Sequence, residues 1–167
     1  ENVALFRNTD LVPEVPATWA ELAEVGRALV DEGKAEVAMA FPDLGYNYFP
    51  VYTAFGGAIF GRDEAGSYSA ELIEIGDEGM VAGAEWANTL IRDGYASDNL
   101  DWEAAHVLFD SGAAPFIITG PWALDRFKSV GVPYAISSFP SVEADGQPGA
   151  PFIGVQGFMV KANSENL

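Results

Sequence analysis

The sequence predicts an α/β fold. Short apolar runs, typical of buried strands, alternate along the chain with longer segments in which apolar residues recur at helical spacing. The chain has 167 residues, 49% of them hydrophobic, which suffices for one domain with a sizeable core. No apolar run reaches the roughly 20 residues that a membrane-spanning helix needs.

The first elements predicted are a strand, a helix and a second strand. Residues 2–7 are apolar and alternate as a strand does. Thr18 and Glu21 match a capping box, in which both side chains satisfy free amides of a first helical turn, and Gly33 is a plausible end of that helix. Residues 37–41 form an apolar run too short for a helix, so they predict a strand.

The next segment, residues 42–50, is dense in aromatic side chains. We expect it to lead into a short helix that ends near Gly56 and Gly57. Residues 61–66 are polar and rich in turn formers, which predicts a hairpin.

Two further helices are predicted in the middle of the chain. The longer begins at Asp77 and ends at Gly94, and the shorter begins at a cap on Asp101 and ends at Gly112. The longer helix carries one apolar stripe, made of Met80, Val81, Ala84, Ala87, Leu90 and Ile91.

The last part of the chain predicts three strands and one helix. Residues 114–119, 132–139 and 152–160 have the apolar content of strands, and residues 143–148 form a loop. Pro121 suits the first position of a helix, where its missing N–H costs nothing.

Charge and composition exclude several classes of function. The net charge is −17, from 25 acidic and 8 basic residues, and such a surface repels nucleic-acid phosphates and anionic membranes. The chain contains no cysteine, which removes disulfides and thiol catalysis. We therefore expect no nucleic-acid partner.

Catalytic and metal-binding motifs are not evident. His106 is the single histidine and falls within a helix, and the chain has no G-x-S-x-G motif, so a structural role is favoured. The acidic loops at residues 63–64 and at Asp145 do not match the calcium-loop pattern. We expect no catalytic residue, no metal and no cofactor. A glycosidase that pairs Asp43 with Glu85 or Glu103 stays an alternative, although nothing in their spacing implies that they converge.

Aromatic residues stand where strands are predicted to end. Tyr46, Tyr48, Phe49 and Tyr52 follow one strand, and Trp122 follows another. Ligands of open α/β sheets bind beyond the carboxyl ends of strands, and rings with a polar tip match the apolar face and hydroxyl rim of a pyranose. The same rings could instead cap the core, and the sequence leaves both interpretations open.

Several short motifs occur in order along nearly the whole chain. They are P-A-T-W-A-E-L at residues 16–22, Y-N-Y-F-P at 46–50, F-D-S-G-A-A at 109–114, T-G-P-W at 119–122 and P-F-I-G-V at 151–155. In this order and spacing they resemble the maltose/maltodextrin-type family of extracellular solute-binding proteins of ABC transporters. The resemblance implies that residues 1–167 form a single α/β lobe of the class II periplasmic-binding-protein type. That lobe has a central mixed sheet flanked by helices, and it is the C-terminal lobe of a two-lobe protein whose N-terminal lobe is absent here.

The same resemblance implies the ligand-binding residues. Tyr46 and Trp122 match aromatic residues that stack on the sugar or hydrogen-bond to it. Glu1 matches a carboxylate of a hinge strand, and Asp43 and Asn47 flank Tyr46 and are expected to supply polar contacts.

The function implied is delivery of a sugar without chemical change. The protein would bind an oligosaccharide outside the cell or in the periplasm and pass it to the permease subunits of an ABC importer. It would be anchored to the membrane through a segment not present here. Leu44-Gly45 and Asn47 depart from the maltodextrin binders, which favours an unspecified oligosaccharide over maltose. A different solute, such as an amino-sugar or a polyol, stays an alternative.

Overall fold

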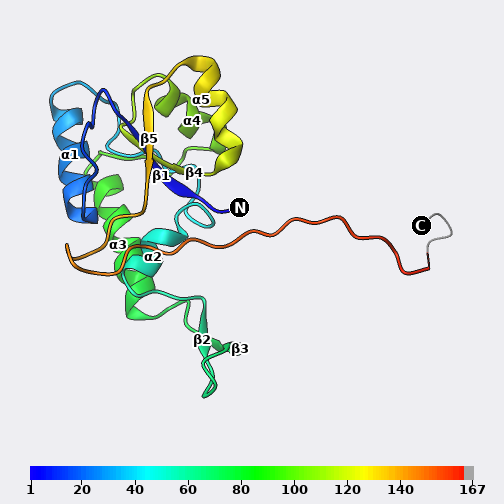
Figure 1. Ribbon diagram of the computed structural model, residues 1–167. Helices are drawn as coiled ribbons and strands as arrows, with labels where there is room; N and C mark the ends of the chain where they lie inside the picture. The colour runs from blue at the N-terminus through cyan, green and yellow to red at the C-terminus, as the bar shows by residue number, and fades with distance from the viewer. Residues whose placement is uncertain (164–167) are drawn as a thin grey trace.

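A three-stranded antiparallel sheet with helices on both sides forms the centre of the computed structural model, which describes residues 1–163 (Figure 1). Strand β1 (Ala4–Asn8) lies between β4 (Phe116–Thr119) and β5 (Tyr134–Ser137) and is antiparallel to both. The predicted α/β class is therefore confirmed. The expected mixed sheet is reduced to an antiparallel one, with parallel pairing limited to isolated bridges such as that between Ala40 and Ile117.

The helices and the second sheet follow the predicted order. The helices are α1 (Trp19–Asp31), α2 (Phe49–Ala54), α3 (Glu78–Arg92), α4 (Trp102–Asp110), the 3₁₀ turn η1 (Pro121–Ala123) and α5 (Leu124–Val130). Strands β2 (Phe60–Arg62) and β3 (Tyr68–Ile73) form the predicted hairpin, which projects from the body in Figure 1. No helix within residues 1–163 has both the length and the apolar content needed to cross a membrane.

Strand alternation divides the core into two clusters, one on each face of the sheet. Leu5 packs in the cluster that contains Trp19, whereas the next residue, Phe6, packs in the cluster that contains Phe127. Successive strand residues point to opposite faces, so both faces of β1 are buried. Accordingly, α1 lies on one side of the sheet in Figure 1, and α4 and α5 lie on the other.

The capping box predicted at the start of α1 is formed in part: Thr18 caps the first turn, whereas the Glu21 carboxylate bonds to the amide of Ala17, one residue before the cap. The Glu21 backbone N–H donates to Thr18 Oγ1 at 3.1 Å, and Glu21 Oε2 accepts from the Ala17 N–H at 2.8 Å. Gly26 then lets α1 approach the following segment closely, because a Cβ at this position would lie 2.7 Å from the Ala38 carbonyl oxygen. The cap at Thr18 therefore fixes where α1 begins, and the absence of a side chain at Gly26 allows the helix to pack closely on Ala38.

Residues 37–41 do not form the predicted strand, although the segment is buried and lies beside β4. Ala38, Met39 and Ala40 are fully buried, and the Ala40 N–H donates to the carbonyl of Phe116, the first residue of β4. The Ala38 N–H instead donates to the Tyr95 carbonyl, beyond the sheet. The segment therefore makes a single bridge to β4 rather than a ladder.

The strand predicted at residues 152–160 is also not formed among the described residues. This stretch leaves the body as an extended trace (Figure 1), and its apolar side chains are largely exposed, with Ile153 at 81%. An extended chain becomes a strand only by pairing its backbone groups with a neighbour. Within the described chain only Glu1 pairs with it, at Gly154.

Helix α3 is rotated relative to its predicted apolar stripe. Gly83, Ala87 and Leu90 are buried, whereas Val81 and Ala84 are exposed. A Cβ at Gly83 would lie 3.0 Å from the Tyr52 Cα, so the glycine permits close packing of α3 on α2. The buried Tyr48 hydroxyl donates to the Gly83 carbonyl at 2.8 Å and fixes this contact.

Candidate functional site

Four aromatic rings from three separate segments form a continuous row at one side of the protein. The Tyr46 and Trp122 centroids are 6.4 Å apart, and the Tyr46 and Phe152 centroids are 5.8 Å apart with an interplanar angle of 14°. Phe152 stacks in turn on Phe49, with centroids 3.8 Å apart and an angle of 13°. We call Phe49, Phe152, Tyr46 and Trp122 the aromatic row. Tyr46 is 39% exposed and Trp122 is 40% exposed, so these two rings can still contact a ligand.

A short turn between residues 43 and 47 carries Tyr46. Asp43 Oδ1 accepts hydrogen bonds from the Gly45 N–H at 2.8 Å and the Asn47 N–H at 3.2 Å. The Asn47 side-chain amide donates to Asp43 Oδ2 at 2.5 Å, and Asn47 is buried. In this structure Asp43 and Asn47 therefore hold the turn that presents Tyr46, and a direct contact from either to a ligand stays a prediction.

Trp122 lies directly after β4, within η1, as the strand-end argument predicted. Gly120 makes room for its ring, because a Cβ at Gly120 would lie 2.4 Å from the indole. The position of the Trp122 ring therefore depends on glycine at residue 120.

Glu1 lies beside the segment that carries Phe152. The backbones of Glu1 and Gly154 exchange two hydrogen bonds, each 2.7 Å long, and the Gln156 side-chain amide donates to Glu1 Oε1 at 2.8 Å. A Cβ built at Gly154 would lie 3.4 Å from Tyr46 Oη and 3.6 Å from Glu1 Cγ. The structure thus brings Glu1, Tyr46 and Trp122 into one region, although they are far apart in sequence.

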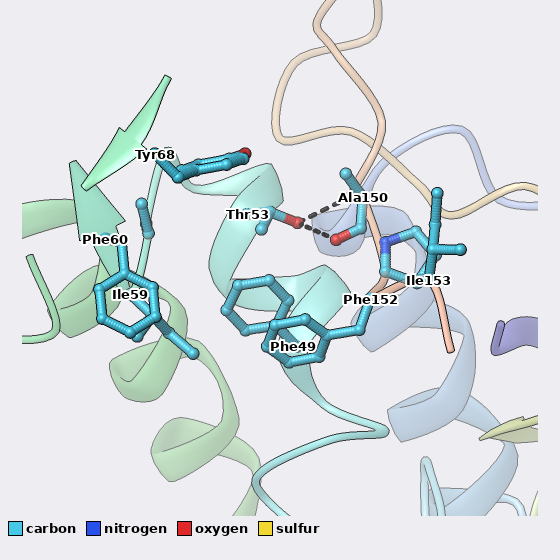
Figure 2. Close-up of a pocket in the computed structure, with 11 residues that line it drawn as sticks. Phe49, Thr53, Ile59, Phe60, Tyr68, Ala150, Phe152 and Ile153 are labelled. Atoms are coloured by element: carbon cyan, nitrogen blue, oxygen red, sulfur yellow. Dashed lines mark hydrogen bonds between the residues drawn. The ribbon is translucent and has the colours of Figure 1, made fainter. Parts of the chain in front are cut away.

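An apolar pocket of about 480 Å³ lies at the Phe49 end of the aromatic row. Figure 2 shows Phe49 and Phe152 face to face at its wall, with Phe60 and Tyr68 of the β2–β3 hairpin opposite. Thr53 Oγ1 accepts from the Ala150 N–H at 2.7 Å and is also 3.0 Å from the Ala150 carbonyl oxygen, the two dashed contacts in the figure. The pocket wall is therefore tied to α2 by hydrogen bonds as well as by stacking.

His106 is a buried structural residue, as its helical position predicted. His106 Nδ1 is 2.6 Å from the Trp102 carbonyl oxygen, which can only accept, so Nδ1 carries the proton. Nε2 therefore accepts from the Thr119 hydroxyl at 3.0 Å. Thr119 ends β4, one residue before Gly120, so this neutral histidine supports the strand end from which Trp122 follows.

Lowering the pH should destabilise the protein through His106. Burial lowers the pKa of His106, and the nearby positive charge of Arg126 acts in the same direction. The folded state disfavours the protonated ring. The stability that neutral His106 contributes is therefore fully present above the unfolded-state pKa of about 6.5. The contribution is lost as the pH falls from that value towards the lower pKa of the folded protein.

The measurement is the melting temperature of wild type and His106→Gln between pH 7.5 and pH 5, a range that brackets the reference pKa of about 6.5. The wild type should lose more stability over this range than the variant, since carboxylate titration is common to both. If the melting temperatures of wild type and His106→Gln fell in parallel with pH, the destabilising role of His106 protonation would be contradicted.

Two of the three carboxylates considered for a hydrolase already have partners, and the third, Glu85, is exposed on α3. Glu103 receives two hydrogen bonds from Arg126, at 2.7 and 2.8 Å, and Asp43 is bonded to Asn47. No group of three or more histidine or acidic side chains within residues 1–163 could hold a metal ion.

Phe152 is the member of this region that sequence reasoning did not select. It was assigned to a strand within the P-F-I-G-V motif, and its contact with Tyr46 arises only from tertiary packing. One signal could have identified Phe152: it belongs to P-F-I-G-V, one of the short motifs that occur in order along the chain.

The family and the known proteins to which this chain is similar are all described as binding proteins. The profile of the family described as "Bacterial extracellular solute-binding protein" matches residues 1–167. A galactooligosaccharide-binding protein of Bacillus subtilis is 33% identical over 99% of this chain and 40% of its own length. A maltotriose-binding protein of Pyrococcus abyssi is 27% identical over 99% of this chain and 36% of its own length. A maltooligosaccharide ABC transporter solute-binding lipoprotein of Streptococcus pneumoniae is 25% identical over 100% of this chain and 40% of its own length.

Proposed function

The chain belongs to the bacterial extracellular solute-binding protein family, and from this premise we propose that it binds a neutral oligosaccharide for uptake by an ABC importer. The observation that carries the proposal is the meeting of Tyr46, Trp122 and Glu1 beside Phe152. Exposed rings offer flat apolar faces to a pyranose, and the Tyr46 hydroxyl and the Glu1 carboxylate offer hydrogen bonds to its rim.

The charge of the region supports a neutral ligand. Glu1, which lies near Tyr46 at Gly154, and Asp43, in the turn that carries Tyr46, are both acidic, and the whole chain carries −17. An anionic solute would be repelled, whereas sugar hydroxyls can donate to carboxylates. The names of the relatives, which specify galactooligosaccharide, maltotriose and maltooligosaccharide, support the same ligand class.

We further propose that residues 1–167 are one lobe of the class II type, the C-terminal lobe of a two-lobe protein. The chain spans 36–40% of the length of these relatives, which leaves room for a second lobe. The two backbone hydrogen bonds between Glu1 and Gly154 support a hinge in which two segments that cross between the lobes run side by side. Ligand would then shift an equilibrium between open and closed lobes and leave the sugar chemically unchanged.

The partners of this proposal are the permease subunits of the importer. The protein would work outside the cell or in the periplasm and be held at the membrane through a segment outside these 167 residues. The Streptococcus pneumoniae relative, which is named a lipoprotein, supports that arrangement.

Titration calorimetry of the full-length native protein tests the proposal. The panel contains galacto- and malto-oligosaccharides, an amino-sugar and a polyol. We expect one neutral oligosaccharide to bind with a Kd of micromolar order, about −8 kcal/mol. Preferential binding of the amino-sugar or polyol would contradict the oligosaccharide assignment, and turnover of an aryl glycoside would favour the hydrolase.

Replacing Gly120 with alanine should weaken oligosaccharide binding about tenfold with little loss of stability (~1.4 kcal/mol of binding free energy). The added methyl group would meet the Trp122 indole at 2.4 Å and displace it, while Gly120 has an extended backbone that alanine can adopt. Gly76→Ala is the matched control, since a Cβ there meets nothing within 4 Å. Equal affinities of the two variants would show that the position of the Trp122 ring does not affect oligosaccharide binding.

A further inference from the structure

We propose that Phe152 is a positioning residue of the ligand site, whose ring fixes the orientation of Tyr46. The inference rests on the proposed function and adds a residue that does not itself have to touch the sugar. Phe152 belongs to the segment that pairs with Glu1, so it links that segment to the binding surface.

Phe152 stacks with two other rings. Phe49 lies at a centroid distance of 3.8 Å and Tyr46 at 5.8 Å, each with its plane nearly parallel to that of Phe152. Phe49 begins α2, which is packed into the body of the domain through Pro50 and Val51. The Phe152 ring therefore transmits the fixed position of α2 to Tyr46.

Hydrogen bonds hold the backbone on each side of Phe152. On one side Thr53 Oγ1 contacts both backbone groups of Ala150, as Figure 2 shows. On the other side Gly154 exchanges two backbone hydrogen bonds with Glu1. Phe152 is thus anchored, in contrast to the exposed residues that follow in the same extended segment.

Tyr46 has few other constraints on its ring. Its hydroxyl makes no hydrogen bond to any side chain or backbone group within residues 1–163, and its remaining ring neighbour, Trp122, is 6.4 Å away and itself half-exposed. The bonds from Asp43 hold the backbone of the turn but not the ring. The orientation of the Tyr46 ring therefore depends on stacking against Phe152.

The test is a double-mutant cycle between Phe152 and Tyr46, measured by titration calorimetry with the full-length native protein and the oligosaccharide it binds best. Phe152→Leu should raise the Kd about three- to tenfold, the range expected when an aromatic pair is lost. Phe152→Tyr keeps the ring and should bind as the wild type does. Val155→Ala is the matched control, because this residue of the same segment is 88% exposed and belongs neither to the aromatic row nor to the pocket wall.

The cycle separates positioning from general structural support. In a Tyr46→Ala background, Phe152→Leu should cause no further loss of affinity, because the residue that it positions is gone. An unchanged Kd in Phe152→Leu, or the same loss in both backgrounds, would overturn the inference while the wild type still binds sugar. If the wild type binds no oligosaccharide at all, the proposed function fails first and the inference fails with it.

Discussion

Trp122→Ala should weaken oligosaccharide binding about 30- to 150-fold, the largest effect on affinity that we expect from one substitution. An aromatic anchor in a binding site is worth about 2–3 kcal/mol when truncated. Trp122 qualifies because it is 40% exposed, lies 6.4 Å from Tyr46 and is held at the end of β4. Titration calorimetry on the full-length native protein gives the Kd.

Val107→Ala is the control for this substitution. Val107 is also apolar and is 49% exposed, but it lies on α4 and belongs neither to the aromatic row nor to the pocket wall. Its removal should leave the Kd unchanged, and neither variant should lower the melting temperature much. Similar affinities for Trp122→Ala and wild type would remove Trp122 from the site.

Phe127→Ala should lower the free energy of unfolding by about 3–5 kcal/mol, the largest stability effect that we expect. The Phe127 ring is fully buried and packs on Phe6, Phe109 and Tyr134, with centroid distances of 5.4, 4.9 and 5.6 Å. Its loss leaves a cavity between the sheet and the layer of α4 and α5, which the surrounding rings cannot fill without moving.

Urea denaturation of the 167-residue chain measures this effect. Val130→Ala is the matched control, since it lies on the same helix, is 52% exposed and should change stability by less than about 0.5 kcal/mol. A loss below about 1 kcal/mol for Phe127→Ala would show that the second core cluster is not packed as described.

Elements defined by local chemistry could be predicted from the sequence. The capping residue Thr18 places the start of α1, and Asp101 places that of α4, because these side chains satisfy amides within their own first turn. The 37–41 and 152–160 predictions failed for a different reason. Apolar content shows that a segment is extended and suited to burial, but a strand also needs a neighbour with unpaired backbone groups.

The candidate site was predictable to a similar extent. Trp122 could be selected because it follows the apolar run that forms β4. Tyr46 was selected after a predicted strand that makes only a single bridge, yet the structure places the two rings together. Asp43 and Asn47 were selected for ligand contacts, yet their hydrogen bonds to each other depend on a turn that spacing alone does not specify. Phe152 was missed because its role comes from packing between α2 and Tyr46, which are distant from it in the chain.

A crystal structure of the full-length native protein with its best oligosaccharide tests the central claim most directly. We expect one pyranose face to pack on the Trp122 indole or the Tyr46 ring at about 4 Å, the ordinary contact distance of apolar atoms. Glu1 should lie within hydrogen-bond distance of a sugar hydroxyl. A sugar bound elsewhere, with both rings left in solvent, would contradict the account.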